Sequence, residues 1–221
     1  WGVIDKLTYS YSGNQLKKIT DKASPLLYSE AFDFKDNTLT NDLEYGYNEM
    51  GAMTYDANKG ITNIEYDNMN RPVRIQFHNG NVTEHVYTPD GRHIRTKHIT
   101  AVPNAVELAV GETHTLTPQQ TLSHTTTDYV GNCVFEGGEF KRYNFDDGYI
   151  FPYWKPETQT YCQGYNYYVK DHQGNIRMIV NNNGTVSQVN HLTAYGASMG
   201  NSYNQEFNKY KYNGKELDRM H

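Results

Sequence analysis

Hydrophobic and polar residues alternate along the segment Arg71 to Thr88, which reads RPVRIQFHNGNVTEHVYT. The dipeptide Asn79-Gly80 at its centre is typical of a tight β-hairpin turn, because both central residues of a type I′ turn need a positive φ. Counting outward from His78 opposite Asn81 predicts these pairs on one face: Phe77 with Val82, Val73 with Val86, and Ile75 with Glu84 as a misfit. Arg74 and His85 then fall on the other face. The pattern predicts a two-stranded antiparallel hairpin.

The hairpins are predicted to follow one another along the chain. Asp90-Gly91 is a second turn signal and places Tyr87 across from Ile94. Consecutive hairpins that share a strand form a meander. A further hairpin is predicted in the segment Asn175 to Tyr195, which turns at Asn183-Gly184. Pairing outward from Asn182 and Thr185 there sets Met178 against Val189.

A short motif recurs through these hairpins: an aromatic residue, then Gly or Asn four places later, then an apolar residue two or three places beyond. Its copies are Tyr9 with Gly13 and Leu16, Tyr47 with Gly51 and Met53, Tyr66 with Asn70 and Val73, and Tyr87 with Gly91 and Ile94. Tyr28 occupies the missing phase, Tyr210 begins a late copy with Gly214 and Leu217, and Lys170 stands in the aromatic position before Gly174 and Ile176. A period near 20 residues is typical of a repeat built from one hairpin.

Two stretches depart from the motif. Residues 101–128 are rich in threonine, contain Pro103 and Pro118, and have no tyrosine, so we expect a surface excursion or an irregular crossover. The stretch Pro152 to Gln163 is expected to form a second loop, because it contains Pro152 and Pro156. Neither stretch is long or apolar enough to be a separate domain.

Composition favours the same fold class. The chain has 221 residues, 20 of them tyrosine and 18 glycine. Tyrosine, threonine and β-branched residues suit the half-buried surface of a sheet, and Gly and Asn supply the positive φ of tight turns. The expected fold is therefore all-β, with a thin, tyrosine-rich core.

Charge and hydropathy restrict the partners. The net charge of −5 and the scattered Lys and Arg argue against a nucleic-acid surface, which needs a basic stripe. No apolar run approaches the ~20 residues of a membrane helix, so we expect no membrane insertion. Trp1 is not an initiator methionine, and we expect the chain to be a fragment. Cys133 and Cys162 are expected to be unpaired thiols, with a disulfide or a redox role as the alternative.

No combination of residues indicates catalysis, a metal or a cofactor. His85 and His93 could share a face of the sheet, but without an HExxH or CxxC motif we expect polar pairing between strands. Asp146 and Asp147 are adjacent and are expected to lie in a turn at Asp147-Gly148 rather than to act as a catalytic pair. No GxSxG elbow or phosphate-binding glycine loop occurs. We expect a protein that is not an enzyme.

The repeat and the C-terminal third carry a resemblance to a known family. The segment Tyr66 to Val73 (YDNMNRPV) resembles the YD signature of the RHS or YD-repeat proteins, in particular the form common in Bacteroidetes. The segments Tyr167 to Gly196 and Tyr210 to His221 resemble the RHS-associated core, and Thr127 to Arg142 resembles the stretch before it. Several copies that lead into this core in the right order are more specific than one copy.

The resemblance implies a role. Repeats of this family form a β-sheet ribbon that spirals into a hollow shell around a variable C-terminal domain, often a toxin, and related shells occur in the C components of bacterial insecticidal toxin complexes and in animal teneurins. It implies YD-repeat hairpins over 1–100, an irregular excursion over 101–128 and RHS-associated core strands over 129–221, in one continuous β-architecture. The implied partners are the rest of the shell and a C-terminal effector, and the implied location is secreted or cell surface. The expected structural residues are Tyr9, Gly13, Tyr47, Gly51, Tyr66, Asp67, Asn70, Tyr87, Gly91, Asp171, Gly174, Tyr210 and Gly214.

Some alternatives stay open. The family's core normally continues past the Tyr210 motif, often into an autoproteolytic aspartate site that frees the cargo, and we expect neither that site nor an effector within this chain. Arg177 resembles a recurrent family position and could line the shell interior or pair across strands. A cell-surface adhesin or carbohydrate-binding β-domain is the alternative function, since exposed tyrosines could stack on glycans. Exposed strand edges also predict self-association.

Overall fold

The chain folds as one long series of antiparallel hairpins. The structure is a computed structural model and describes residues 5–24, 34, 36, 43–193 and 196–217. These residues divide into two compact units, with the boundary between Asp128 and Tyr129. No α-helix occurs among them, and two short 3₁₀ turns, Pro118–Gln120 and Tyr212–Gly214, are the helical elements of these ranges. The predicted all-β fold of antiparallel hairpins is confirmed.

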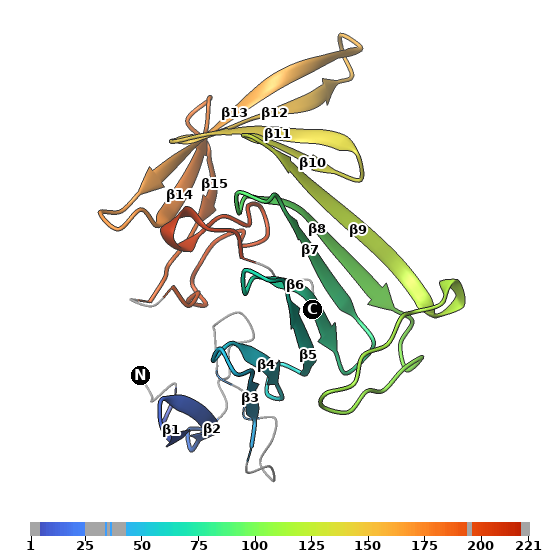
Figure 1. The fold of residues 1–221 in the computed structure, drawn as a ribbon. Helices are drawn as coiled ribbons and strands as arrows, with labels where there is room; N and C mark the ends of the chain where they lie inside the picture. Colours follow the sequence, from blue (N-terminus) through green and yellow to red (C-terminus); the bar gives the residue numbers. More distant parts are fainter. Residues whose placement is uncertain (1–4, 25–33, 35, 37–42, 194–195, 218–221) are drawn as a thin grey trace. The chain divides into compact units, whose positions relative to one another are not determined.

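Within each of two sheets, consecutive strands pair in the order in which they follow one another in the sequence (Figure 1). A separate two-stranded sheet holds β1 (Leu7–Ser12) and β2 (Gln15–Asp21). The main sheet has 13 strands in chain order. Those that begin in the first unit are β3 (Tyr45–Tyr47), β4 (Met53–Asp56), β5 (Ile61–Tyr66), β6 (Pro72–Phe77), β7 (Val82–Tyr87), β8 (His93–Ala101) and β9 (Thr121–Val130). Those of the second unit are β10 (Cys133–Glu136), β11 (Glu139–Phe145), β12 (Gly148–Lys155), β13 (Thr160–Lys170), β14 (Ile176–Asn181) and β15 (Val186–Val189).

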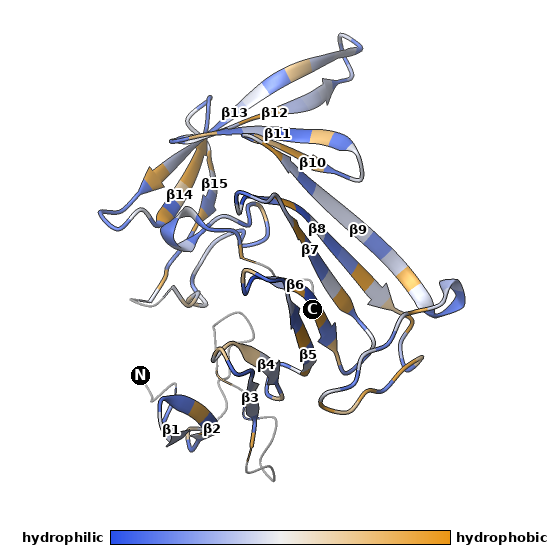
Figure 2. Ribbon diagram, in the orientation of Figure 1, coloured by the Kyte–Doolittle hydropathy of each residue, from blue (hydrophilic) through white to orange (hydrophobic). Residues whose placement is uncertain are grey.

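Among the described residues, more of the buried side chains are polar than apolar. Hydrophilic and hydrophobic residues alternate along single strands (Figure 2). This alternation is typical of an antiparallel sheet that is covered on one face and exposed to solvent on the other. The largest fully buried side chains include isoleucines of β14 and also amides. Buried amides must be hydrogen-bonded, so the packing of each unit depends on polar networks as well as on apolar contact.

The register of the β6–β7 hairpin differs by one residue from the prediction. Phe77 pairs with Asn81 rather than with Val82, because its N–H donates to the carbonyl of Asn81 at 2.9 Å. Among the turn residues, Gly80 has a positive φ of 87° and Asn79 does not, so the loop has three residues and is not a type I′ turn. The expected misfit disappears, because Glu84 now lies opposite Arg74.

Of two other predicted cross-strand pairs, one is wrong and one is confirmed. Tyr87 lies opposite His93 and not Ile94, since a β-bulge shifts the register between β7 and β8. Met178 does lie opposite Val189, as predicted, although the turn residue Asn181 pairs with Thr185 and a bulge restores the register.

Both predicted loops contain strands. The segment Pro152 to Gln163 belongs mainly to the β12–β13 hairpin, in which these two residues pair. The prediction was wrong because β11 pairs with β12 only as far as Ile150, and proline is tolerated where a strand has a free edge. The irregular stretch between β8 and β9 ends at the 3₁₀ turn before Thr121, so it is shorter than residues 101–128. The turn expected at Asp147-Gly148 consists of Asp146 and Asp147, and Gly148 already pairs with Phe145.

Four of the predicted motif tyrosines lie on strands, and a fifth lies in an isolated β-bridge. Tyr9 lies in β1, and Tyr47, Tyr66 and Tyr87 end β3, β5 and β7. Tyr210 forms an isolated bridge with Glu216. The copy expected at Tyr28 lies outside the described residues.

Candidate functional site

One five-residue turn recurs through both units. In each copy the N–H of the first residue donates to the carbonyl of the fifth, the N–H of the fourth donates to the carbonyl of the first, and the fourth has a positive φ. The copies begin at Asn48, Asp67, Phe77, Thr88, Asp171, Asn181 and Thr193. The fourth residue is glycine in all of them except the Asp67 copy, where it is Asn70. Gly and Asn are the residues that enter the left-handed region at low cost, which explains the Gly or Asn of the motif.

The motif tyrosine is the residue just before the turn, as at Tyr47, Tyr66 and Tyr87. The copy at Tyr9 differs, because Ser12 pairs with Gln15 around a two-residue loop that contains Gly13. The copy at Tyr210 is a variant, in which the N–H of Lys211 donates to the carbonyl of Lys215 but the turn between them is a 3₁₀ turn with Gly214. The structural role assigned to these residues stays a prediction.

An Asp or Asn at the first turn position closes the turn with its side chain. The Oδ1 atom of Asp67 accepts the N–H groups of Met69 at 2.9 Å and Arg71 at 3.0 Å. The same two bonds, to the third and fifth residues, occur at Asn48, Asp171 and Asn181. Satisfying two backbone donors that the ladder leaves open is the physical reason for the Asp of the YD pair.

Replacing this aspartate tests that role. We expect Asp67→Ala to lower the midpoint of thermal unfolding, because two backbone N–H groups lose their acceptor. Asp67→Asn should lower it much less, since Asn48 and Asn181 make the same bonds naturally. Circular dichroism on both variants measures the difference, and equal losses would contradict the side-chain cap.

The fifth turn residue links one turn to the next. The Arg71 Nε atom donates to Asp67 Oδ2 at 2.6 Å, its Nη1 atom donates to the carbonyl of Thr88 at 3.1 Å, and its guanidinium lies 4.8 Å from the centre of the Tyr87 ring. In the second unit Asn175 takes this position: its Nδ2 atom donates to Asp171 Oδ2 at 2.9 Å, and its Oδ1 atom accepts the N–H of Asn213 at 2.8 Å. In both turns, the side chain of the fifth residue thus joins the turn to another segment of the chain.

These contacts make stability depend on pH. Hydrogen bonds from the Arg71 side chain hold the pKa of Asp67 below its usual value, and the Asn175 side chain does the same for the pKa of Asp171. A carboxyl with a lowered folded pKa stabilises the fold above its unfolded pKa of about 4, and the contribution is lost as pH falls through the folded pKa. We expect thermal stability to fall below about pH 4 and to fall less in an Asp67→Asn, Asp171→Asn double variant. If the midpoint of thermal unfolding falls by the same amount with pH in both proteins, this prediction is contradicted.

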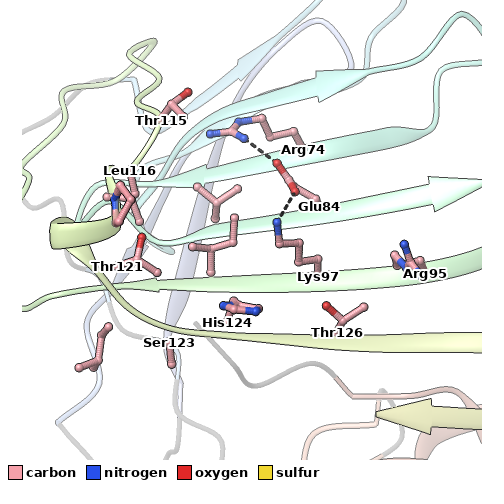
Figure 3. Close-up of a pocket in the computed structure, with 14 residues that line it drawn as sticks. Arg74, Glu84, Arg95, Lys97, Thr115, Leu116, Thr121, Ser123, His124 and Thr126 are labelled. Carbon is pink, nitrogen blue, oxygen red and sulfur yellow. Dashed lines mark hydrogen bonds and ion pairs between the residues drawn. The ribbon is translucent and has the colours of Figure 1, made fainter. Parts of the chain in front are cut away.

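The first unit also has a groove of about 800 Å³ on one face of β6–β9 (Figure 3). A row of side chains crosses its floor, because the register sets Arg74 opposite Glu84, Glu84 opposite Lys97 and Lys97 opposite Thr126. Arg74 Nη1 lies 2.8 Å from Glu84 Oε1, and Lys97 Nζ lies 3.9 Å from Glu84 Oε2. The floor is therefore a ladder of paired charges.

The groove also has an apolar end. Val82 and Ile99 lie opposite each other on the floor there, and Leu116 and Pro118 line it from the segment between β8 and β9. That segment is fixed to the sheet near His114, whose carbonyl accepts Arg74 Nη2 at 2.9 Å and whose N–H donates to the Gln76 side chain at 3.1 Å. The wall is thus held by the same arginine that forms part of the floor.

The sequence analysis did not predict this groove. The predicted register of the β6–β7 hairpin differs by one residue from the observed one, so it places Glu84 opposite Ile75 instead of opposite Arg74. The misfit of a carboxylate opposite an isoleucine was the signal that could have found the charged row, because a shift of one residue removes it.

The other candidate residues are placed as follows. His85 and His93 share a face of the β7–β8 hairpin with 3.3 Å between Nδ1 and Nε2. Arg177 Nη1 lies 3.9 Å from Asp171 Oδ2, in a pairing within the same hairpin. Cys133 and Cys162 are free thiols. Among the described residues, no group of three or more His, Cys, Asp or Glu side chains could hold a metal ion, and no helix is long and apolar enough to span a membrane.

Comparison with solved structures supports the fold. The chain is similar to one in the crystal structure of TcdB2-TccC3-TEV, with a TM-score of 0.51 and 13% identity over 96% of this chain and 11% of that chain. It is also similar to a Photorhabdus luminescens Tc holotoxin pore with a substituted TccC3, with a TM-score of 0.49, 14% identity and the same coverage of both chains. No protein-family model matches the chain, and no curated protein matches it. This chain therefore has the β-fold of a segment that makes up about a ninth of the matched chain in the TcdB2-TccC3-TEV structure.

Proposed function

We propose that this chain is a non-catalytic wall segment of an RHS/YD-repeat shell that encloses and delivers a C-terminal effector domain. The observation that carries the proposal is the recurrence of one turn, six times between consecutive strands of the antiparallel meander β3–β15 and once after it. In such a repeat each hairpin contacts only its neighbours, so further hairpins can be added to enlarge the sheet into a wall. The fold shared with the TcdB2-TccC3-TEV structure along 96% of this chain supports it. The parent protein is then secreted or on the cell surface, with the rest of the shell and the effector as partners.

The chemistry of the groove fits a wall better than a catalytic centre. Its charged groups are paired, because Glu84 contacts both Arg74 and Lys97 and Glu65 lies 3.9 Å from Arg74. Hydroxyl side chains of β9 lie beside them. A surface of paired charges, hydroxyls and a few apolar side chains offers many weak contacts to a polypeptide and no strong one. This suits a wall that must hold a cargo and later release it.

Crosslinking in the parent protein tests the proposal. His124 and Thr125 are neighbouring exposed residues of β9 that face opposite sides of the sheet. A photo-crosslinking amino acid at each position samples both faces of the same wall. We expect one of the two positions to crosslink to the downstream domain and the other not to. Absence of a crosslink from both positions would overturn the proposal.

A glycan-binding role is the second candidate, and one exposed aromatic pair favours it. Trp154 and Tyr161 lie opposite each other near the end of the β12–β13 hairpin, with ring centres 5.1 Å apart and exposed fractions of 50% and 76%. Exposed aromatic rings stack on sugars. A glycan array decides: specific binding that is lost in a Trp154→Ala, Tyr161→Ala double variant would favour the adhesin. The half-buried Tyr47 and Tyr66, changed one at a time, are the controls.

Strand edges predict self-association of this chain. β12 and β13 continue past the last β11 pair at Ile150, so among the described residues one edge of β12 has no ladder partner from Phe151 to Lys155. Unpaired edges offer N–H and C=O groups to another chain. We expect dimers or larger species in light scattering at high concentration. A strictly monomeric profile would contradict this prediction.

A further inference from the structure

Two histidines and a threonine meet on one face of the β7–β8 hairpin. His85 lies directly opposite Thr96, and Tyr87 lies opposite His93. Thr96 and His93 are three residues apart, so a regular strand would put them on opposite faces. The register shift between Val86 and Tyr87 inserts an extra residue into β8 and brings His93 to the face of Thr96 and His85. The bulge thus builds the cluster.

Three polar atoms of this cluster form a nearly equilateral triangle. His85 Nδ1 lies 3.3 Å from His93 Nε2 and 3.3 Å from Thr96 Oγ1, and His93 Nε2 lies 3.1 Å from the same hydroxyl. Each of the two ring nitrogens therefore lies within hydrogen-bonding distance of the other and of the same hydroxyl oxygen.

The spacing of the two nitrogens fits a tetrahedral metal ion. Two imidazole nitrogens bound to Zn²⁺ at about 2.0–2.1 Å lie about 3.3 Å apart when the ion is tetrahedral, and about 2.9 Å apart when they are cis ligands in a square plane. The observed 3.3 Å matches the tetrahedral arrangement. Both histidines are partly exposed, whereas Thr96 is buried, so an ion and its water ligands could reach the pair from solvent.

We propose that His85 and His93 form a Zn²⁺ site, with the Thr96 hydroxyl beside the ion and water completing the tetrahedron. Imidazole is a preferred ligand of Zn²⁺ and a poor one for Mg²⁺. The ion joins β7 to β8 next to their bulge and so stabilises the hairpin when it binds. This site goes beyond the absence of metal ligands expected from the sequence, which had no motif to show it. It does not depend on the shell function.

Calorimetric titration of the untagged chain with Zn²⁺ at neutral pH tests the site. We expect a single site whose affinity falls by about tenfold or more in His85→Gln and in His93→Gln. His172→Gln is the matched control, because His172 is exposed in a turn of the second unit, and it should leave the affinity unchanged. Mg²⁺ should produce no binding signal. Absence of Zn²⁺ binding, or binding of equal affinity in all three variants, would overturn the proposal.

A second measurement identifies the ligand atoms without any substitution. Long-range ¹H–¹⁵N spectra of the histidine rings report which nitrogen changes on titration. We expect Zn²⁺ to shift Nδ1 of His85 and Nε2 of His93, while the resonances of His172 stay in place. Shifts confined to other histidines would refute the assignment even if Zn²⁺ binds. Thr96→Val should weaken binding less than either histidine change, because a neutral hydroxyl is a weak ligand.

Discussion

Replacing Gly148 with alanine should destabilise the second unit by about 3 kcal/mol. Gly148 begins β12 and lies between β11 and β13, where it pairs with Phe145 and Tyr167. A Cβ atom added there would lie 2.0 Å from the carbonyl oxygen of Asn166 and 2.9 Å from the Phe145 ring. The carbonyl belongs to the backbone and cannot rotate away, so the β12–β13 ladder would have to move. Urea unfolding followed by circular dichroism measures the loss.

Gly184→Asn is the matched control. Gly184 holds the fourth position of the Asn181 turn with a φ of 81°, and nothing lies within 4 Å of the place where its Cβ would be. The Asp67 turn already has an asparagine, Asn70, at this position. We therefore expect a change of about 0.5 kcal/mol or less. Similar losses at Gly148 and Gly184 would show that the carbonyl contact does not limit the residue at Gly148.

The fold could be predicted from the sequence because each hairpin turn is marked by residues that lie close together in the sequence. The Gly or Asn of each motif copy marks the fourth residue of the same turn, and the tyrosine marks the end of the incoming strand, so strands and turns could be counted along the chain. Register could not be predicted as well, because it depends on whether the loop has two or three residues. Gly80 can adopt a positive φ in either loop, and nothing in the dipeptide Asn79-Gly80 decides between them.

The candidate sites needed the register and therefore the structure. The charged row of the groove exists only when Glu84 lies opposite Arg74, and the histidine cluster exists only because a bulge in β8 turns His93 to the face of His85. Bulges leave no clear mark in a sequence of alternating residues. The sequence showed that His85 and His93 could share a face, but it could not give the distance between them.

The segment after the last strand is joined to the sheet by the side chain of Gln188. Gln188 of β15 is completely buried, and the two N–H groups of its Nε2 atom are shared among the carbonyl oxygens of Asn204 at 3.0 Å, Gln205 at 2.9 Å and Asn208 at 3.3 Å. One side chain thus holds the segment after the last strand against the sheet. We expect Gln188→Leu, which nearly preserves the volume, to cost about 3 kcal/mol in the free energy of unfolding, because buried carbonyls lose their donor.

Gln163→Leu separates this effect from the general cost of losing an amide. Gln163 lies on β13 and is exposed, so its replacement should change the free energy of unfolding by about 0.5 kcal/mol or less. Limited proteolysis gives a second measure, since Gln188→Leu should expose the segment 202–210 to cleavage before the sheet unfolds. If the variant loses less than about 1 kcal/mol and its C-terminal segment stays protected, the bridge Val189–Tyr203 and the Lys211 contacts hold that segment without Gln188. The conclusion would then be that backbone pairing, and not the buried amide, joins the last segment of the wall to its sheet.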